Sequence, residues 1–195
     1  MRQHRGMRLP ALLLALAATT ASAQPAAYVL DPAHSFVHFE VLHFGTSTSS
    51  GRFGPIAGVV TLDRGAGRGA VSLRIPTAGV DTGLPVFNAR LREADLLDSA
   101  EFPDAYFVAT QFRFEGESLA EVRGEFTLRG VSQPLSLFAR RFACRSDEGT
   151  EVCGGDFEGE LLRSDFGVDY LLPFVANRVR LTVQVEGRRR QPDPS

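Results

Sequence analysis

The sequence predicts an all-β fold, an antiparallel barrel or sandwich formed by one domain. Between Tyr28 and Val185, about eight to ten short runs alternate apolar and polar residues, which is the period of a half-buried strand. Clusters of Gly, Pro, Asp and Ser separate most of the runs, and this spacing is typical of antiparallel sheets. A single stretch has helical character, so we expect one β domain with one short helix.

The first run begins at Tyr28 and divides into two faces. One face carries Ser35, Val37, Phe39 and Val41, and the other carries His34, Phe36, His38 and Glu40. The later runs alternate in the same way, and in chain order they are Ile56–Leu62, Val71–Ile75, Tyr106–Ala109, Phe112–Phe114, Val122–Leu128, Leu135–Ala139, Phe157–Leu161 and Val179–Val185. The Ser/Thr run Thr46–Ser50 is expected in a turn.

The helical stretch is Phe87–Leu97. Leu91 lies three and four residues from Ala94 and Asp95, which is the spacing of one helix face. Asn88 is a suitable N-cap, so the helix is expected to begin there. The following Glu101–Asp104 contains a proline and returns the chain to strand.

The N-terminus has the features of a cleaved export signal over residues 1–23. Arg2, Arg5 and Arg8 form a basic region, Leu9–Ala18 is apolar, and Ala21-Ser22-Ala23 matches a signal-peptidase site. The apolar run is shorter than the roughly 20 residues that a spanning helix needs. We therefore expect cleavage after Ala23 and a periplasmic or secreted protein with no membrane span.

The mature chain is expected to be one acidic domain. Removing the signal leaves about 172 residues, a size that suits a single core. The signal contains three of the 21 basic residues and no acidic residue, so 18 basic residues face 23 acidic ones and the net charge is −5. This charge argues against a nucleic-acid partner. Residues 24–187 form the expected domain, and residues 188–195, which begin with Arg188–Arg190, form an expected disordered tail.

Cys144 and Cys153 are the only cysteines. In an exported chain an even pair predicts a disulfide. Ser146–Gly149 between them is a strong turn signal, so the bond is expected to join the base of a hairpin. The spacing differs from the C-x-x-C of redox-active pairs, which favours a structural role.

Motifs for metal or catalytic chemistry are weak. His34 and His38 would lie roughly 13 Å apart on one strand face, too far to share an ion that each must approach to about 2 Å. His43 has the opposite parity. The chain contains no G-x-S-x-G elbow. We therefore expect no metal, no cofactor and no catalytic residue.

The acidic side chains around the predicted helix are a solvated face in the simplest interpretation. They leave an acid/base pair open as an alternative. The members of this group are Asp81, Glu93, Asp95, Asp98, Glu101 and Asp104.

The chain contains fifteen Phe and no Trp. A barrel of about eight strands can be filled by side chains or can hold one small ligand. The parity of the apolar residues does not decide between a packed interior and a cavity, and both remain open at this point.

Six segments together resemble the YceI family of exported lipid-binding proteins. Each motif is weak alone, but they occur in register over the whole mature chain. They are Tyr28–Ser35 with Val37, Phe39, Val41 and His43; Gly51–Phe53 with Gly58; Val80–Gly83; Asp95–Ala105; Gly124–Val131; and Arg163–Val168.

The resemblance implies a lipocalin-like antiparallel barrel of eight strands, with an elongated apolar cavity and the short helix near its mouth. It also implies binding of a long isoprenoid or other amphiphilic lipid chain. Two features depart from the family. Arg90-Leu91 stands where the family usually has His-Leu, and the hairpin from Cys144 to Cys153 looks like an addition.

These observations lead to the hypothesis of an exported carrier, sequestration or storage protein that holds a lipid chain in the barrel without catalysis. The expected wall is formed by the inward strand faces: Val37, Phe39, Val41, Ile56, Val60, Val71, Leu73, Phe107, Phe126, Leu128 and Phe166. His43 and Arg90 are expected at the mouth. Two alternatives remain, namely an enzyme that uses His43 with a helix carboxylate, and a packed domain without a ligand. The oligomeric state is open, with a homodimer among the possibilities.

Overall fold

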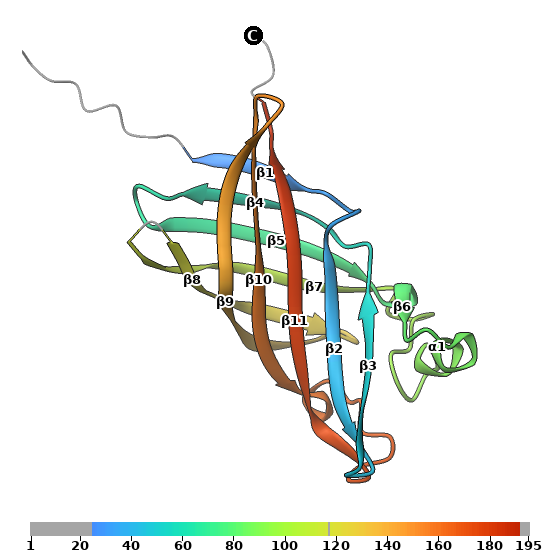
Figure 1. The fold of residues 1–195 in the computed structure, drawn as a ribbon. Coiled ribbons are helices and arrows are strands. Elements are labelled where there is room, and N and C mark those ends of the chain that lie inside the picture. The colour runs from blue at the N-terminus through green and yellow to red at the C-terminus, as the bar shows by residue number, and fades with distance from the viewer. Residues whose placement is uncertain (1–24, 117, 192–195) are drawn as a thin grey trace, which may run out of the picture.

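The computed structural model describes residues 25–116 and 118–191, and it forms a closed antiparallel barrel of eight strands (Figure 1). Around the barrel the strands are β1 (Ala26–Leu30), β4 (Ala57–Asp63), β5 (Arg68–Pro76), β7 (Asp104–Glu115), β8 (Ser118–Leu128), β9 (Val131–Asp147), β10 (Thr150–Leu162) and β11 (Val175–Arg189). The pairing of β1 with β11 closes the ring. The fold class predicted from the sequence is confirmed.

Strand β11 has two partners on one edge. Its C-terminal end pairs with β1 through Tyr28 and Arg189, and its earlier part pairs with β2 (Phe36–His43) through Val37 and Val183. Strand β3 (Ser47–Phe53) pairs with β2, and the short β6 (Val80–Asp81) pairs with β3. Strands β2 and β3 extend the barrel wall beyond β1 toward the lower end in Figure 1, and β6 lies at the other end of β3, beside α1 (Pro85–Leu91).

Two hairpins have tight two-residue turns. Arg129 and Gly130 join β8 to β9, and Glu148 and Gly149 join β9 to β10, all four with positive φ. This conformation matches the right-handed twist of the paired strands. The turn predicted within Ser146–Gly149 is therefore confirmed.

The strand faces follow the predicted alternation. Side chains of the same parity point inward and form one apolar core, which includes Val37, Ile56, Val71, Leu73, Ile75, Phe107, Val122, Leu135, Leu137, Phe157, Leu181 and Val183. Burying these apolar surfaces provides the main stabilisation of the barrel, because apolar burial is worth about 25 cal/mol per Å².

The predicted disulfide is confirmed. Cys144 on β9 and Cys153 on β10 are directly opposite in the strand register and are joined by a bond between their sulfur atoms. The disulfide lies near the turn end of the β9–β10 hairpin and not at its base, because the two strands stay paired beyond it as far as Phe138 and Glu158.

The predicted helix is displaced. Helix α1 covers Pro85–Leu91, with Leu84 rather than Asn88 at its N-cap. Asn88 lies inside the helix, and its Oδ1 accepts hydrogen bonds from the backbone nitrogen and the hydroxyl of Thr82. A proline at the first helical position starts the helix, which suits its fixed φ.

Two strand assignments are also corrected. The Ser/Thr-rich Ser47–Ser50, expected in a turn, belongs to β3, because pairing with β2 satisfies its backbone groups. His34, expected on the strand face of His38, lies in the turn before β2, where its Nδ1 is 2.9 Å from the Asp31 carboxylate.

The boundary predicted for the C-terminal tail is wrong. Strand β11 continues through Arg189, with Arg188 opposite Val152 and Arg189 opposite Tyr28. Arg188 and Arg189 also form ion pairs with Asp147 and Glu151. The predicted export signal and the last four residues lie outside the described part of the chain.

Candidate functional site

Two apolar chambers follow one another inside the barrel. The larger, which we call the lower chamber, has a volume of about 220 Å³ and lies beside the wall formed by β2 and β3. The smaller, the upper chamber, has a volume of about 70 Å³ and lies toward β1 and the disulfide.

The two chambers are in line along the strands. On β5, Leu73 lines the upper chamber and Ile75 lines the lower one, and the same step of two residues separates Val183 from Leu181 on β11. Side chains two residues apart lie on the same strand face. The two chambers are therefore neighbours along the same strands, and packed core side chains separate them.

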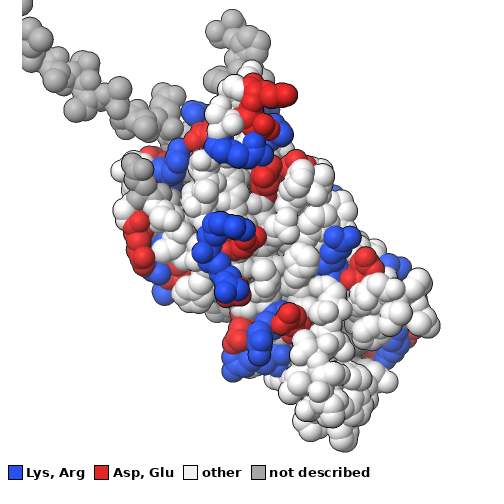
Figure 2. Space-filling model, in the orientation of Figure 1, with Lys and Arg blue, Asp and Glu red and all other residues white. Residues whose placement is uncertain are grey.

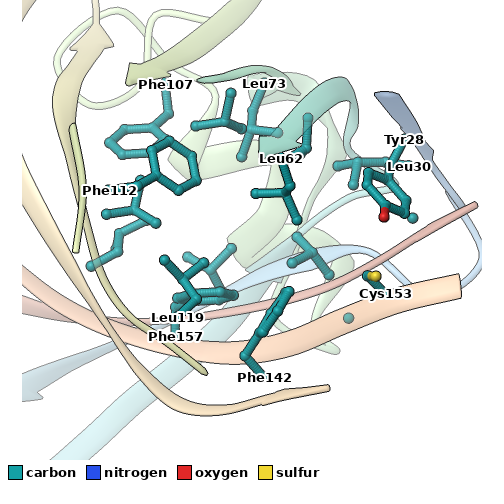
Figure 3. Close-up of a pocket in the computed structure, with 18 residues that line it drawn as sticks. Tyr28, Leu30, Leu62, Leu73, Phe107, Phe112, Leu119, Phe142, Cys153 and Phe157 are labelled. Carbon is teal, nitrogen blue, oxygen red and sulfur yellow. The ribbon is translucent and has the colours of Figure 1, made fainter. Parts of the chain in front are cut away.

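Aromatic and aliphatic side chains surround the upper chamber (Figure 3). Phe112, Phe142 and Phe157 approach it from different strands. Tyr28 is the only lining side chain with a hydroxyl group, and it donates a hydrogen bond of 2.8 Å to Glu151. Burial is the main cause that raises the pKa of Tyr28 to about 12, and the hydrogen bond to the Glu151 carboxylate is the second.

The lower chamber has an aromatic wall. The ring of Phe39 on β2 lies against Phe53 on β3, with ring centroids 5.4 Å apart. Gly51 makes this possible, since a Cβ at that position would lie 2.6 Å from the Phe39 ring. On the opposite side, Phe126 lies edge-on to Phe166 at 5.5 Å.

Residues 82–103, which we call the cap segment, contribute Phe87, Arg90, Leu91, Leu96 and Leu97 to the lower chamber. Hydrogen bonds attach the segment to the barrel. Thr77 donates to the carbonyl of Phe102 at 2.8 Å, and the guanidinium of Arg129 donates to the carbonyls of Ala94 and Leu96. These bonds hold the apolar side of the segment against the chamber.

Residues 167–174, which we call the rim loop, are organised by one buried arginine. The guanidinium of Arg163 donates to the carbonyls of Val168, Tyr170, Val175 and Ala176 at 2.8–2.9 Å. Burial lowers the pKa of Arg163, and the four carbonyl dipoles replace the hydration that the charge loses. Val168, Tyr170 and Leu171 of the rim loop line the lower chamber.

Arg90 joins the cap segment to the rim loop. Its guanidinium binds both carboxylate oxygens of Asp95 at 2.6 Å, contacts Glu93 at 3.0 Å and lies 4.4 Å from the centre of the Tyr170 ring. The hydrogen bonds to Asp95 are the main cause that raises the pKa of Arg90, and the interaction with Tyr170 is the second. Arg90 is therefore charged. Because two carboxylates surround this charge, the mouth carries little net positive charge.

Most of the expected wall residues line a chamber. Those at the lower chamber are Val37, Phe39, Val41, His43, Arg90, Phe126 and Leu128. Those at the upper chamber are Val60, Val71, Leu73 and Phe107. Ile56 is fully buried in the core and lines neither chamber, and Phe166 lies behind Phe126. Whether these side chains contact a ligand stays a prediction.

Apart from Arg90, sequence reasoning missed the side chains that the cap segment and the rim loop contribute. Leu96, Leu97, Tyr170, Leu171 and Arg163 lie outside regular strands, so strand parity gave no information about them. The available signal was composition, since Tyr170–Leu172 is an apolar run in a loop that would otherwise be expected to be polar.

Several of the acidic side chains near the helix are partners of arginines. Asp95 and Glu93 bind Arg90, and Asp104 binds Arg74 at 3.1 Å. The hydrogen bond from Arg90 lowers the pKa of Asp95, which keeps this carboxylate ionised. A general acid needs the opposite shift.

Among the described residues, two groups place three donor side chains within 4.8 Å of one another. One contains Cys144 and Cys153, whose sulfurs form the disulfide. The other contains Asp31, His34 and Glu186 on the surface, with His34 exposed. Neither group includes the His34 and His38 pair considered from the sequence.

In the described ranges, none of the helices has the length and apolar content that crossing a membrane requires.

Residues 28–187 match the protein family described as YceI-like domain. Protein YceI of Salmonella arizonae is 34% identical over 179 residues, which cover 90% of this chain and 93% of that protein. Protein YceI of Salmonella heidelberg has the same identity and coverage.

Solved structures with the same fold have lower identity. The crystal structure of Burkholderia cenocepacia BcnA has a TM-score of 0.67 at 21% identity and covers 80% of this chain and 98% of BcnA. A polyisoprenoid binding domain from Saccharophagus degradans has a TM-score of 0.64 at 20% identity, and the match covers 85% of this chain and 99% of that domain. At these identities the similarity concerns the fold.

Proposed function

Because this chain belongs to the YceI-like family, we propose that it is a lipid-binding protein that holds the chain of an isoprenoid or similar amphiphile in its lower chamber. The observation that carries the proposal is the chamber itself, an apolar space of about 220 Å³ whose few polar side chains include His43, Arg90 and Tyr170. Ligand sites in proteins are typically apolar with a small number of polar groups that fix orientation.

Transfer of an apolar chain from water supplies the binding free energy. Each enclosed methylene contributes about 0.8 kcal/mol, so a dozen carbons provide on the order of 10 kcal/mol before the costs of association. No chemical step by the protein is needed. A chain that extends beyond the lower chamber points toward the upper one, because the two lie in line along β5 and β11.

The name of the Saccharophagus degradans domain supports an isoprenoid as the ligand class, since that protein is described as binding polyisoprenoids. The disulfide supports the location proposed from the sequence, outside the cytoplasm, because such bonds persist in oxidising compartments. The proposed roles are therefore transport, sequestration or storage of a lipid in the periplasm or beyond the cell.

The alternative of an enzyme that uses His43 with a cap carboxylate has less support. Glu93 and Asp95 are both engaged by Arg90 and are not paired with an imidazole. The alternative of a packed domain has less support because the barrel contains two chambers. Turnover of an apolar ester that is lost in His43→Ala would restore the enzyme hypothesis.

Uptake of farnesol by the delipidated protein tests the proposal. The apolar fluorophore N-phenyl-1-naphthylamine should bind with one site per chain, and farnesol should displace it competitively. The exposed residue Phe138 provides a control, since Phe138→Ser should leave this binding unchanged. The absence of saturable binding of both compounds would contradict the proposed function.

A further inference from the structure

Large apolar side chains are exposed around the mouth of the lower chamber. They come from the β2–β3 hairpin, the start of α1 and the rim loop, and we call them the apolar rim: Leu42, Phe44, Leu84, Val86, Leu171 and Phe174. Val86 is 81% exposed, Phe174 60% and Phe44 51%. Isolated exposed apolar residues are ordinary, but a group of them marks an interaction surface.

The rim is held together as one structure. The rings of Phe44 and Phe174 stack with centroids 5.8 Å apart, and the backbone nitrogen of Phe44 donates to the carbonyl of Phe174 at 2.7 Å. The β2–β3 hairpin and the rim loop therefore present their apolar side chains together. The guanidinium of Arg90, which lies over the Tyr170 ring, connects the cap segment to the same loop.

Charged side chains do not occur in the stretches that carry the rim residues, and the one charged residue of the rim loop, Asp169, directly precedes its stretch. Residues 41–51, 82–89 and 170–177 contain no Asp, Glu, Lys or Arg. In Figure 2 the end of the molecule where β2 meets β3 and β11 begins shows neither blue nor red on its visible face. An uncharged surface of this kind is suited to an apolar environment and not to recognition of a charged partner.

Charged pairs resume further along the same strands. Arg180 on β11 lies 3.9 Å from both Glu40 on β2 and Glu160 on β10, and Arg178 forms an ion pair with Glu160. These strands therefore change from uncharged to charged within a few residues. The same change occurs in proteins that insert an apolar end into a membrane interface and leave a polar surface in water.

The rim adjoins the chamber directly. His43, Tyr170, Leu171 and Val175 line the lower chamber, and Leu42, Phe44 and Phe174 are their neighbours in the chain. A surface that covered the rim would therefore lie at the opening of the chamber. For an amphiphile that resides in a bilayer, this arrangement lets the chain pass into the protein without crossing water.

We infer that the apolar rim docks on the surface of a lipid bilayer and aligns the lower chamber with the membrane. The inference rests on the proposed function, since a lipid ligand is what makes a bilayer the relevant surface. Insertion of a few apolar side chains into the headgroup boundary gives reversible attachment without a membrane span. A bilayer is favoured over a second copy of the chain because head-to-head pairing would place the two chamber mouths against each other, closed to the lipid source.

Co-sedimentation of the delipidated mature protein with phosphatidylcholine vesicles tests this inference. Phe44→Asn with Phe174→Ser removes the stacked pair, and asparagine tolerates the positive φ of 51° at position 44. Neither ring lines a chamber. Phe138→Ser with Tyr106→Ser is the matched control, because it removes two exposed aromatic rings elsewhere on the barrel, 51% and 43% exposed.

The rim variant should bind the vesicles at least about tenfold more weakly than the parent, and the control variant should bind like the parent. Attachment should persist in high salt, since screening does not weaken apolar insertion. Equal binding of both variants, or binding that requires anionic lipid, would overturn the inference. A dimer that depends on Phe44 and Phe174 and does not attach to vesicles would identify a second copy as the occupant and would also overturn it.

Binding of N-phenyl-1-naphthylamine separates this result from the proposed function. If the inference holds, the rim variant loses vesicle attachment and keeps the fluorophore in the chamber. A parent protein that attaches to vesicles through the rim but takes up neither fluorophore nor farnesol would contradict the proposed function and leave the docking surface in place.

Discussion

The guanidinium of Arg90 lies 4.4 Å from the centre of the Tyr170 ring and joins helix α1 to the rim loop across the edge of the lower chamber. Asp95 fixes the orientation of Arg90 through two hydrogen bonds of 2.6 Å. A histidine at this position could not form the same two-pronged contact with a carboxylate. This chain therefore closes one side of the chamber with an arginine.

Replacing Arg90 should accelerate ligand release. Arg90→Met keeps an apolar side chain but removes the contacts with Asp95 and Tyr170, so the cap segment should open more often. We expect the dissociation rate of N-phenyl-1-naphthylamine to rise roughly two- to fivefold, with little change in thermal unfolding. Stopped-flow fluorescence measures the rate. Arg92→Met is the control on the same segment, and equal rates in the two variants would contradict the role of Arg90.

Polar substitutions in the aromatic wall should weaken binding more than they weaken the fold. In Phe39→Ser and Phe126→Ser a hydroxyl must lose water without a partner when a lipid enters, which costs about 1–3 kcal/mol, or roughly a 5- to 150-fold loss of affinity. Unfolding should change by less than the about 3–5 kcal/mol of a Phe→Ala change in a packed core, because these rings already face a cavity.

Farnesol displacement and thermal unfolding of the delipidated protein check both parts. Phe138→Ser, on the outer surface, should change neither quantity. Severe loss of stability in both wall variants, together with unchanged farnesol affinity in whatever fraction remains folded, would show that Phe39 and Phe126 are core residues.

The inward faces of the barrel strands could be predicted from the alternation of apolar and polar residues. Val37, Phe39 and Val41 alternate with polar residues, and all three line the lower chamber, because a strand has a period of two regardless of its partners. Strand β3 was missed because Ser47–Ser50 is Ser/Thr-rich and weakly apolar, and pairing with β2 outweighs that local signal.

The two chambers could not be predicted from the sequence. Ile56 and Val60 have the same parity on one run, yet Ile56 is fully buried in the core and Val60 lines the upper chamber. Ile56 precedes β4, which begins at Ala57, so strand parity does not determine where its side chain lies. The role of Arg163 could not be predicted either. Two of its carbonyl partners, Val168 and Tyr170, belong to the rim loop, whose path the sequence does not define. The other two, on Val175 and Ala176, stand at the start of β11.

Alkaline pH should weaken the upper end of the barrel through Tyr28. Burial raises its pKa from 10.0 to about 12, so the folded protein keeps a proton that the unfolded chain releases. The stability from this difference is complete below pH 10 and is lost as the pH rises through about 12. The phenolate absorbance that disappears in Tyr28→Phe should therefore develop near pH 12. Tyr106→Phe should leave that step in place, and a Tyr28 step near pH 10 would be inconsistent with the burial described.

The disulfide should stabilise the fold by limiting the unfolded chain. Closing a loop as short as that between Cys144 and Cys153 is worth about 2–3 kcal/mol in the chain-entropy model. Cys144→Ala with Cys153→Ala should lower the free energy of unfolding by that amount in urea. Thiol labelling of the denatured, unreduced parent should find no free cysteine. Two free thiols per chain would contradict the disulfide, and an unchanged unfolding curve would contradict its contribution.

Native mass spectrometry of the protein purified without detergent from the cells that produce it tests the central claim most directly. The account predicts a complex of one chain with one long apolar amphiphile, which the organic extract would then identify, and a smaller bound fraction in Phe126→Ser. Detection of the bare chain alone, with no uptake of farnesol after the same protein is offered it, would contradict the account.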